Sequence, residues 1–440
     1  MLPGLIERVT RDRPRVEPVP SCVSYSAHLS ARPEFAPYVV DTVTGGAALG
    51  DHDKAREAAM GEAVERYCGN VVPPALPMAS HGQLARAGTP AADPREFALY
   101  SPSQYAHRGF PFVAMTPDLE IAWVPGTDLT DGAEVLVPAS LAYVNYFRGP
   151  HSAEPPTNYP LLAGAAAGPS SEQAQRAALE EVLERDAVTL WWLSGAPATA
   201  LVPQTGGPVA AAADEAQAAG LLVTFLRIPS TFAVTVVGAF IEDPTRQLVA
   251  FGSACRSSAE AAAAKALTEA VGMHETGMEL LDHDGGFWTG VRAGRYGHRP
   301  YRPYRSDRAY RDDFRPDLRD INDVRLQVQF HLDPRTQGSR LDRLRAPGTP
   351  RPLPRTSAEG YLRQLTAQGL RAVTVDLTTP EVRAAGLHAA RVLVPGLSCN
   401  APAAFPFLGG RRLYEEPVAR GWVPGPLTET GLVLDPLPFS

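Results

Sequence analysis

The stretch "AQRAALEEVLER", from Ala174 to Arg185, ends with two glutamates three residues apart and an arginine directly after them. Two other segments align with it without gaps: "AREAAMGEAVER" from Ala55 to Arg66 and "AAAKALTEAVGM" from Ala262 to Met273. Each segment has alanine at its first position and glutamate at its eighth, and its composition is typical of helices. The repeat predicts three glutamate-bearing helices at the centre of the fold.

The repeated glutamates gather on one face of each helix. Residues three and four positions apart share a helix face, so each pair of glutamates lies beside its arginine. The glutamates are Glu62, Glu65, Glu181, Glu184 and Glu269, and the arginines are Arg66 and Arg185. Clustered, buried carboxylates repel one another and become protonated unless a cation holds them. Mg²⁺ suits carboxylate oxygens and commonly shares phosphate ligands, and arginine binds phosphate directly, so the pattern favours a magnesium and phosphate site.

The residues alone leave other interpretations of these motifs to weigh. A single Glu-x-x-Glu-Arg is usually a solvent-exposed helix face with ion pairs, and the second and third copies argue against that here. A di-iron helix bundle needs Glu-x-x-His, whereas arginine follows these glutamates and His274 lies out of register. Asp282, His283 and Asp284 are adjacent and point in different directions, which disfavours a metal site there.

Composition and cysteine usage exclude several classes of protein. Cys22, Cys68, Cys255 and Cys399 are far apart, so neither a zinc site nor a disulfide framework is expected, and no His/Asp companion marks a catalytic thiol. The net charge of −7 argues against general binding to nucleic acid or anionic membranes. The chain has no apolar run long enough to span a membrane and no secretory h-region, so we expect a cytoplasmic protein.

Strand-like segments alternate with the three predicted helices, which favours an α+β fold with mixed sheets packed against the glutamate-bearing helices. These segments are "EIAWVPGTDL", "EVLVPASLAYVNYF", "LLVTFLRI", "FAVTVVGAFIED", "QLVAFGSA", "LRAVTVDLT" and "HAARVLVPGLSCN". Ser170 with Gln173, and Ser257 with Glu260, have the spacing of capping boxes at helix starts.

We expect one domain over residues 1–440. It divides into a first lobe at about 20–150, the second and third glutamate helices in 151–284, an Arg/Tyr-rich surface excursion at 285–350, and a C-terminal part with a proline-rich end at 351–440.

Taken together, the motifs resemble the YcaO family, and within it the cyclodehydratases that modify ribosomally made peptides. "MGEAVERY", "GAAAGPSSEQAQRAALEEVLERDA" and "AKALTEAV" are similar to the three ATP-binding helices of that family. Its other parts are matched by "WVPGTDL", "VLVPASLAYV", "FHLDPR", "VTVDLT", "RVLVPGL" and "LDPLPFS". The resemblance runs from about residue 20 to the C-terminus.

The resemblance implies a YcaO-type ATP-binding fold and an enzyme that uses ATP and Mg²⁺ to phosphorylate a backbone amide oxygen of a precursor peptide. Attack by a Cys, Ser or Thr side chain then gives an azoline. Some relatives form amidines or thioamides by the same activation, and a non-catalytic, peptide-presenting subunit is a further alternative. Carried over by position, the five glutamates are ligands of the metal, directly or through water, and Arg66 and Arg185 orient them or touch phosphate. No residue is assigned a catalytic role.

The chain departs from the family pattern around these glutamates. The usual Gly-Lys-Gly before the first helix is "GGAALG", a common serine is Ala58, and the usual Asn-Gly before the second helix is Ala163-Gly164. The resemblance also places Gln173 where a glutamate is usual, and Gly272 and His274 where a later Gln and Arg are usual.

Lys265 stands where the third helix of the family normally has arginine. Only Lys54 and Lys265 are lysines, although the chain is rich in arginine, so a lysine at this position indicates a fitted role. We expect Lys265 to contact a nucleotide phosphate; the alternative is that it only pairs with Glu269 on the same helix face.

The resemblance also bears on partners. A ribosomal precursor peptide is the expected substrate, and neither nucleic acid nor a membrane is an expected partner. The chain starts close to the first motif, which leaves little room for a fused leader-binding domain. We therefore expect a separate leader-binding protein or direct recognition of the peptide, and a homodimer remains open.

Overall fold

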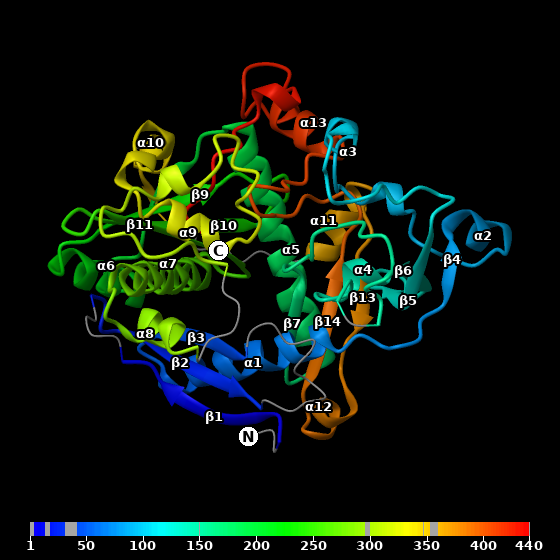
Figure 1. Cartoon of the computed structure of the whole chain (residues 1–440), viewed down its shortest axis with the longest axis horizontal. Coiled ribbons are helices and arrows are strands. Elements are labelled where there is room, and N and C mark those ends of the chain that lie inside the picture. Colours follow the sequence, from blue (N-terminus) through cyan, green and yellow to red (C-terminus); the bar gives the residue numbers. More distant parts are fainter. Residues whose placement is uncertain are drawn as a thin grey trace.

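In the computed structural model, three β-sheets and three long helices, α1, α5 and α7, build the body of the molecule (Figure 1). The structure describes residues 4–13, 18–30, 42–148, 150–294, 300–345, 347–352 and 360–439. The architecture is the α+β arrangement that the sequence predicts, because each long helix packs against strands.

The N-terminal sheet is antiparallel and has the order β1 (Ile6–Arg11), β2 (Cys22–Leu29) and β3 (Val43–Leu49). Helix α1 (His52–Asn70) follows β3 and packs on β2 and β3. Asp51 caps its start, with the side chain accepting a hydrogen bond from the Lys54 backbone N–H. The cap and the short connection fix α1 against the sheet that precedes it.

The second sheet has the order β11-β10-β9-β8-β12. Its strands are β8 (Thr199–Val202), β9 (Leu222–Ile228), β10 (Thr235–Asp243), β11 (Leu248–Arg256) and β12 (Arg351–Pro352). Neighbours are antiparallel except for β12, which runs parallel to β8. Helix α7 (Ala259–Leu281) packs on β10 and β11, and α6 (Pro208–Ala218) packs beside α7.

The third sheet has the order β4-β5-β13-β14-β7, with β6 paired to β5. Its strands are β4 (Met78–Ser80), β5 (Glu120–Asp128), β6 (Glu134–Pro138), β7 (Ala165–Gly168), β13 (Val373–Asp376) and β14 (His388–Leu393). Helix α5 (Ser171–Ser194) packs on β7 and β14 and also contacts β11, so it links the second and third sheets.

Shorter helices complete the described chain. They are α2 (His81–Arg86), α3 (Pro102–Ala106), α4 (Ala139–Ala142), α8 (Gly286–Arg292), α9 (Arg325–Phe330), α10 (Asp342–Arg345), α11 (Tyr361–Ala367), α12 (Pro380–Ala384) and α13 (Arg412–Ala419). None of the described helices combines the length and the apolar composition needed to cross a lipid bilayer.

Each long helix repeats the same local arrangement. A strand of small residues ends, a capping residue follows, and the helix begins at His52, Ser171 or Ala259. The alanines at the first and fifth positions of the sequence repeat are fully buried in all three helices: Ala55, Ala59, Ala174, Ala178, Ala262 and Ala266. These small side chains let the helix backbone approach the neighbouring strand closely, so the repeated alanines set the helix–sheet distance.

Two strand glycines meet the helix backbone at this contact. A Cβ at Gly46 of β3 would lie 2.0 Å from the backbone nitrogen of Ala59. A Cβ at Gly252 of β11 would lie 2.3 Å from the carbonyl oxygen of Ala266. Neither position has room for a side chain, which explains why glycine stands there in the first and third copies.

The structure confirms the three predicted helices and most predicted strands, with two local corrections. The segment "EVLVPASLAYVNYF" is a strand only to Pro138, because the next residues turn into α4. Ser170 is the N-cap of α5 as predicted, but α7 is capped by Ser258 rather than Ser257. The hydroxyl of Ser258 accepts a hydrogen bond from the Ala261 backbone N–H at 3.2 Å.

The Arg/Tyr-rich segment differs from the surface excursion that the sequence predicts. Tyr310, Phe314 and Phe330 are buried in a cluster that also includes Leu280, from the end of α7. Arg308 donates to three backbone carbonyls, of Leu332, Arg246 and Gln247. The density of arginine suggested a solvated segment, whereas here guanidinium groups satisfy backbone carbonyls around a small core. Residues 295–299 and 346 of this segment lie outside the described residues.

Candidate nucleotide and metal site

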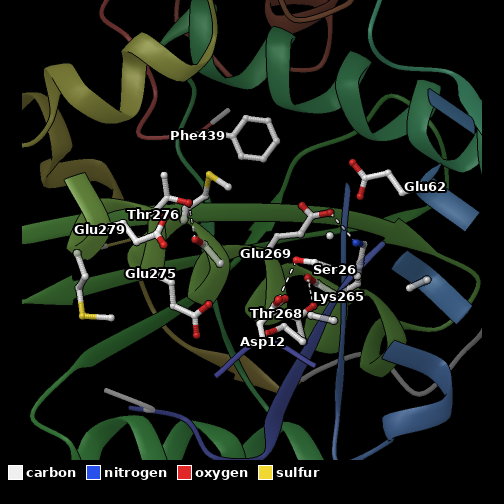
Figure 2. Close-up of a pocket in the computed structure, with 18 of the residues that line it drawn as sticks. Asp12, Ser26, Glu62, Lys265, Thr268, Glu269, Glu275, Thr276, Glu279 and Phe439 are labelled. Atoms are coloured by element: carbon white, nitrogen blue, oxygen red, sulfur yellow. Dashed lines mark hydrogen bonds and ion pairs between the residues drawn. The ribbon is translucent and has the colours of Figure 1, made fainter. Parts of the chain in front are cut away.

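A cavity of about 1590 Å³ is lined by residues of α1, α5 and α7 together with β1, β2, β3, β7 and the end of β11. Figure 2 shows Glu62, Lys265 and Glu269 facing this space, with the Phe439 ring on another side of it. All eight residues that the sequence singles out line the cavity: Glu62, Glu65, Arg66, Glu181, Glu184, Arg185, Lys265 and Glu269. The fold therefore brings the three sequence-distant motifs together; which ligands they hold stays a prediction.

The two arginines of the repeat occupy equivalent places. Arg66 Nη2 lies 3.5 Å from Glu62 Oε1, and Arg185 Nη2 lies 3.7 Å from Glu181 Oε1, in each case one helical turn apart. Arg185 Nη1 also lies 3.4 Å from Glu184 Oε1, and the guanidinium carbon lies 4.4 Å from the centroid of the Phe439 ring. The ring and the carboxylates together fix the plane of this guanidinium.

Glu184 is bound by the protein itself. The Ser253 hydroxyl donates to its Oε1 at 2.7 Å, and the Cys255 backbone N–H donates to its Oε2 at 3.2 Å. Burial raises the pKa of Glu184 to about 7, although the neighbouring Arg185 opposes the shift. Glu184 therefore ties α5 to β11 in addition to lining the cavity, a structural role that its repeat position did not predict.

The carboxylates outnumber the cations around them. Burial raises the pKa of Glu65 to about 8; Arg66 opposes this shift, and the carboxylates of Glu181 and Glu62 add to it. Burial also raises the pKa of Glu62, again against the effect of Arg66. Among the described residues, ten carboxylates and eight Lys or Arg side chains line the whole cavity, and the three motifs contribute five of these carboxylates and three of the cations, so negative charge is in excess. A divalent cation would offset that excess.

Lys265 and Glu269 form the closest ion pair among the eight residues. Lys265 Nζ lies 3.0 Å from Glu269 Oε1, and this carboxylate raises the pKa of the ammonium group (Figure 2). The other oxygen, Glu269 Oε2, is buried and has no hydrogen-bond partner among the described residues. Arg185 Nη1 is likewise a buried donor without a hydrogen-bond partner of good geometry there.

The donor set fits a magnesium ion with phosphate. Glu269 Oε2 and Arg185 Nη1 are buried without hydrogen-bond partners in the described part of the chain, and both residues line the cavity. Within the same residues, no three His, Cys, Asp or Glu side chains are close enough to enclose a metal ion by themselves. Mg²⁺ commonly completes its shell with water and substrate phosphates, so a partial protein shell suits it.

The register of the motif decides which glutamates reach the cavity. Glu180 directly precedes Glu181 but faces away, because neighbouring residues on a helix lie about 100° apart. Its carboxylate accepts a hydrogen bond from the Tyr361 hydroxyl at 3.0 Å and lies 3.7 Å from Arg256 Nη1. Tyr361 and Arg256 thus bind the carboxylate of Glu180 on a side of α5 away from the cavity.

Of the other sequence candidates, Asp282 lines the cavity, whereas His274, His283, Asp284 and the four cysteines do not. His274 is buried, and its Nε2 lies 3.0 Å from Asp243 Oδ2, so it supports the end of β10 and does not line the cavity. All four cysteines are free. Burial raises the pKa of Cys68 to about 11, which agrees with an unreactive thiol.

Phe439 and Arg391 are among the residues near the site that sequence reasoning missed. Phe439 lines the cavity and stacks on Arg185, whereas the sequence indicated only a proline-rich end. Arg391 lies fully buried in β14, next to the loop that precedes β7. Its signal was an arginine inside the apolar strand "HAARVLV", where a charge needs a nearby partner.

Comparisons with known proteins agree with the resemblance. The sequence model of the YcaO family, described as an ATP- and Mg²⁺-binding cyclodehydratase, matches residues 46–398. ATP and Mg²⁺ are thus the ligands of the matched family, as the sequence predicts. No curated protein matches the chain in sequence.

Several solved structures share the fold. A heterocyclase in complex with substrate and cofactor has a TM-score of 0.69 at 19% identity, covering 99% of this chain and 55% of the other. YcaO from Methanopyrus kandleri bound with AMPPCP and Mg²⁺ has 0.57 at 18%, covering 90% and 87%. The E. coli microcin synthetase McbBCD complex with pro-MccB17 bound has 0.57 at 13%, covering 88% of each chain. This chain spans about half the length of that first heterocyclase.

Proposed function

Because the chain belongs to the YcaO cyclodehydratase family, we propose that it uses Mg²⁺ and ATP to activate a backbone amide of a precursor peptide. O-phosphorylation of the amide oxygen makes the carbonyl carbon more electrophilic. A Cys, Ser or Thr side chain of the peptide then attacks that carbon, and loss of phosphate leaves an azoline ring. The net change in the peptide is the loss of one water molecule.

The observation that carries this proposal is the convergence of the three motifs. Five carboxylates from α1, α5 and α7 share one cavity with Arg66, Arg185 and Lys265. Phosphoryl transfer requires mainly positioning and neutralisation of charge, and this wall offers donors for both metal and phosphate. A solvent-exposed helix face, the simplest alternative for each motif alone, would not place all three in one cavity.

The residues of the chain would divide these tasks between them. Glu62, Glu65, Glu181 and Glu269 would hold Mg²⁺ directly or through water, and the metal would neutralise phosphate charge. Arg66 and Lys265 add positive charge to the same cavity. The contacts with Glu181, Glu184 and Phe439 hold Arg185 in place. Fixed cations of this kind bind phosphate without having to reorganise during the reaction.

The size of the cavity suits a nucleotide with a peptide beside it. Small-molecule sites commonly occupy roughly 300–1000 Å³, and this cavity has about 1590 Å³. A precursor peptide is the proposed partner, and a separate leader-binding protein is one way to bring it to the site. Residues as far apart in the sequence as Arg11 and Phe439 line the same cavity. Because distant segments build one site, we propose one YcaO-like domain over residues 1–440.

The test replaces metal ligands by residues of equal size. Glu62→Gln and Glu269→Gln should each abolish most ATP turnover in the presence of precursor peptide, with little change in the melting temperature. Glu172→Gln is the matched control, since Glu172 is exposed in the first turn of α5 and does not line the cavity. Near-normal turnover in both cavity variants would overturn the assignment of the site.

Mass spectrometry of the product tests the chemistry. A loss of one water fits an azoline or an amidine, and exchange of oxygen for sulfur marks a thioamide. Fragmentation then distinguishes a ring at a side chain from a macrocycle. Peptide binding without any nucleotide turnover would instead indicate a peptide-presenting subunit.

A further inference from the structure

Arg391 is a fully buried arginine in β14, and its guanidinium group holds two backbone carbonyls. Its Nε donates to the carbonyl oxygen of Ala142 at 3.0 Å, and its Nη1 donates to the carbonyl oxygen of Ala163. Its Nη2 has no hydrogen-bond partner among the described residues. A buried guanidinium is costly unless nearby groups compensate its charge, so its surroundings require an explanation.

The carbonyl of Ala163 belongs to the same peptide group as the N–H of Gly164. That N–H donates to Glu181 Oε2 at 2.9 Å. One peptide group therefore connects the cation to the carboxylate: Arg391 binds its oxygen, and Glu181 accepts from its nitrogen. Hydrogen bonds in such a chain polarise one another. Arg391 therefore strengthens the hydrogen bond that the Gly164 N–H donates to Glu181.

The peptide group between them is fixed in place. Gly164 has a φ of +87°, and a Cβ there would lie 2.7 Å from the carbonyl oxygen of Val392 and 2.8 Å from Val182 Cγ2. The Val392 backbone N–H donates to the carbonyl oxygen of Gly164 at 2.7 Å. The strand that carries Arg391 therefore also holds the far side of Gly164, and the connection has little freedom to move.

The charges agree with this connection. Burial lowers the pKa of Arg391, while the carboxylates of Glu181 and Glu65 act to raise it. Both glutamates line the cavity, whereas Arg391 does not. Arg391 thus lies behind the cavity wall, where its charge attracts these two carboxylates without contacting a ligand in the cavity.

We propose that Arg391 is a positioning residue for the metal site: through the Ala163–Gly164 peptide group it orients the Glu181 carboxylate for Mg²⁺. The inference rests on the proposed function, since it needs Glu181 to be a ligand of the metal. Partners that orient a ligand from behind typically change metal affinity by about 10–100-fold when they are removed.

The experiment measures binding of ATP as a function of Mg²⁺ concentration, by calorimetry and without peptide. Arg391→Gln removes the charge and should raise the Mg²⁺ concentration for half-maximal binding about tenfold or more. Arg391→Lys keeps the positive charge on a single donor nitrogen and should restore part of the lost affinity. If the glutamine variant does not fold, the lysine variant is compared with the wild type instead.

Arg343→Gln is the matched control. Arg343 is a half-buried arginine that binds carbonyls of Trp191 and Trp192 on α5 and does not line the cavity. Its loss should lower the melting temperature and leave the Mg²⁺ dependence unchanged.

The outcomes are distinct. If the wild type binds ATP in a Mg²⁺-dependent way and the folded Arg391 variants show the same Mg²⁺ dependence, the role of Arg391 is overturned and the proposed function is not. The same shift in Arg343→Gln would show a general effect of stability and would also overturn it. Absence of Mg²⁺-dependent ATP binding in the wild type would overturn the proposed function, and this inference with it.

Discussion

Lys265 Nζ lies 3.0 Å from Glu269 Oε1, and both side chains face the cavity from one turn of α7. The pair itself is what a solvated helix face would show, so its distance alone does not reveal a ligand. The surroundings of the pair favour a ligand, because the second oxygen of Glu269 is buried without a hydrogen-bond partner in the described residues.

If Lys265 binds a nucleotide phosphate, Lys265→Ala should raise the apparent KM for ATP about tenfold or more. A charged hydrogen bond is worth roughly 1.5–3 kcal/mol, which corresponds to that factor. Lys265→Arg should restore binding if charge alone matters. The measurement is nucleotide affinity for the three proteins, and equal affinity in the alanine variant contradicts the assignment.

Gly46→Ala should destabilise the fold, because its Cβ would lie 2.0 Å from the Ala59 backbone nitrogen and neither backbone has room to give way. Overpacking of this kind typically costs about 1–3 kcal/mol or more of the free energy of unfolding. Gly45→Ala is the control in the same strand, since no atom lies within 4 Å of the added Cβ. Denaturant unfolding of both variants is the measurement, and equal stabilities would refute the close helix–strand contact.

The stability of the metal-free protein should fall as the pH rises from 5 to 9. Burial raises the pKa of Glu65 from 4.5 to about 8 and that of Glu184 from 4.5 to about 7. Between those values the folded protein holds protons that the unfolded chain releases. The contribution to stability is therefore full below pH 4.5 and is lost as the pH rises through about 7 and about 8. Melting temperatures in chelator should show a shallower fall for Glu65→Gln than for the wild type; parallel curves would contradict the shift.

Phe439→Leu should weaken nucleotide binding by roughly two- to tenfold. The substitution keeps an apolar side chain but removes the ring face 4.4 Å from the Arg185 guanidinium carbon. A cation–π contact is worth about 0.5–2 kcal/mol, and the lower part of that range gives this factor. Phe439→Tyr retains the face and should bind normally, so equal losses in the two variants would exclude the ring as the cause.

The helices and the glutamate register were predictable from the sequence because both depend on local periodicity. The alanines at positions one and five and the glutamate at position eight recur in the chain itself, and the structure buries the first two in every copy. Charge alone did not predict that the copies share one cavity, because carboxylates repel one another. That expectation came from the resemblance to the YcaO family.

The supports of the site were not predictable, because they come from distant segments. Glu184 is held by Ser253 and Cys255, and Glu181 by the Gly164 N–H, contacts that no spacing in the sequence encodes. The prediction that the Arg/Tyr-rich segment is a surface excursion was wrong for a related reason. Composition shows that arginines are numerous, but it does not show whether water or backbone carbonyls surround them, as the carbonyls do at Arg308.

Phe439 lines the same cavity as residues of α1, so the cavity joins segments that are far apart in the sequence. A ribosome releases α1, α5 and α7 before it releases Phe439, and a domain generally folds as a unit. The acidic residues of the cavity are therefore synthesised before its aromatic one. A chain whose translation stops short of residue 439 would carry every glutamate of the site and still lack the ring that stacks on Arg185.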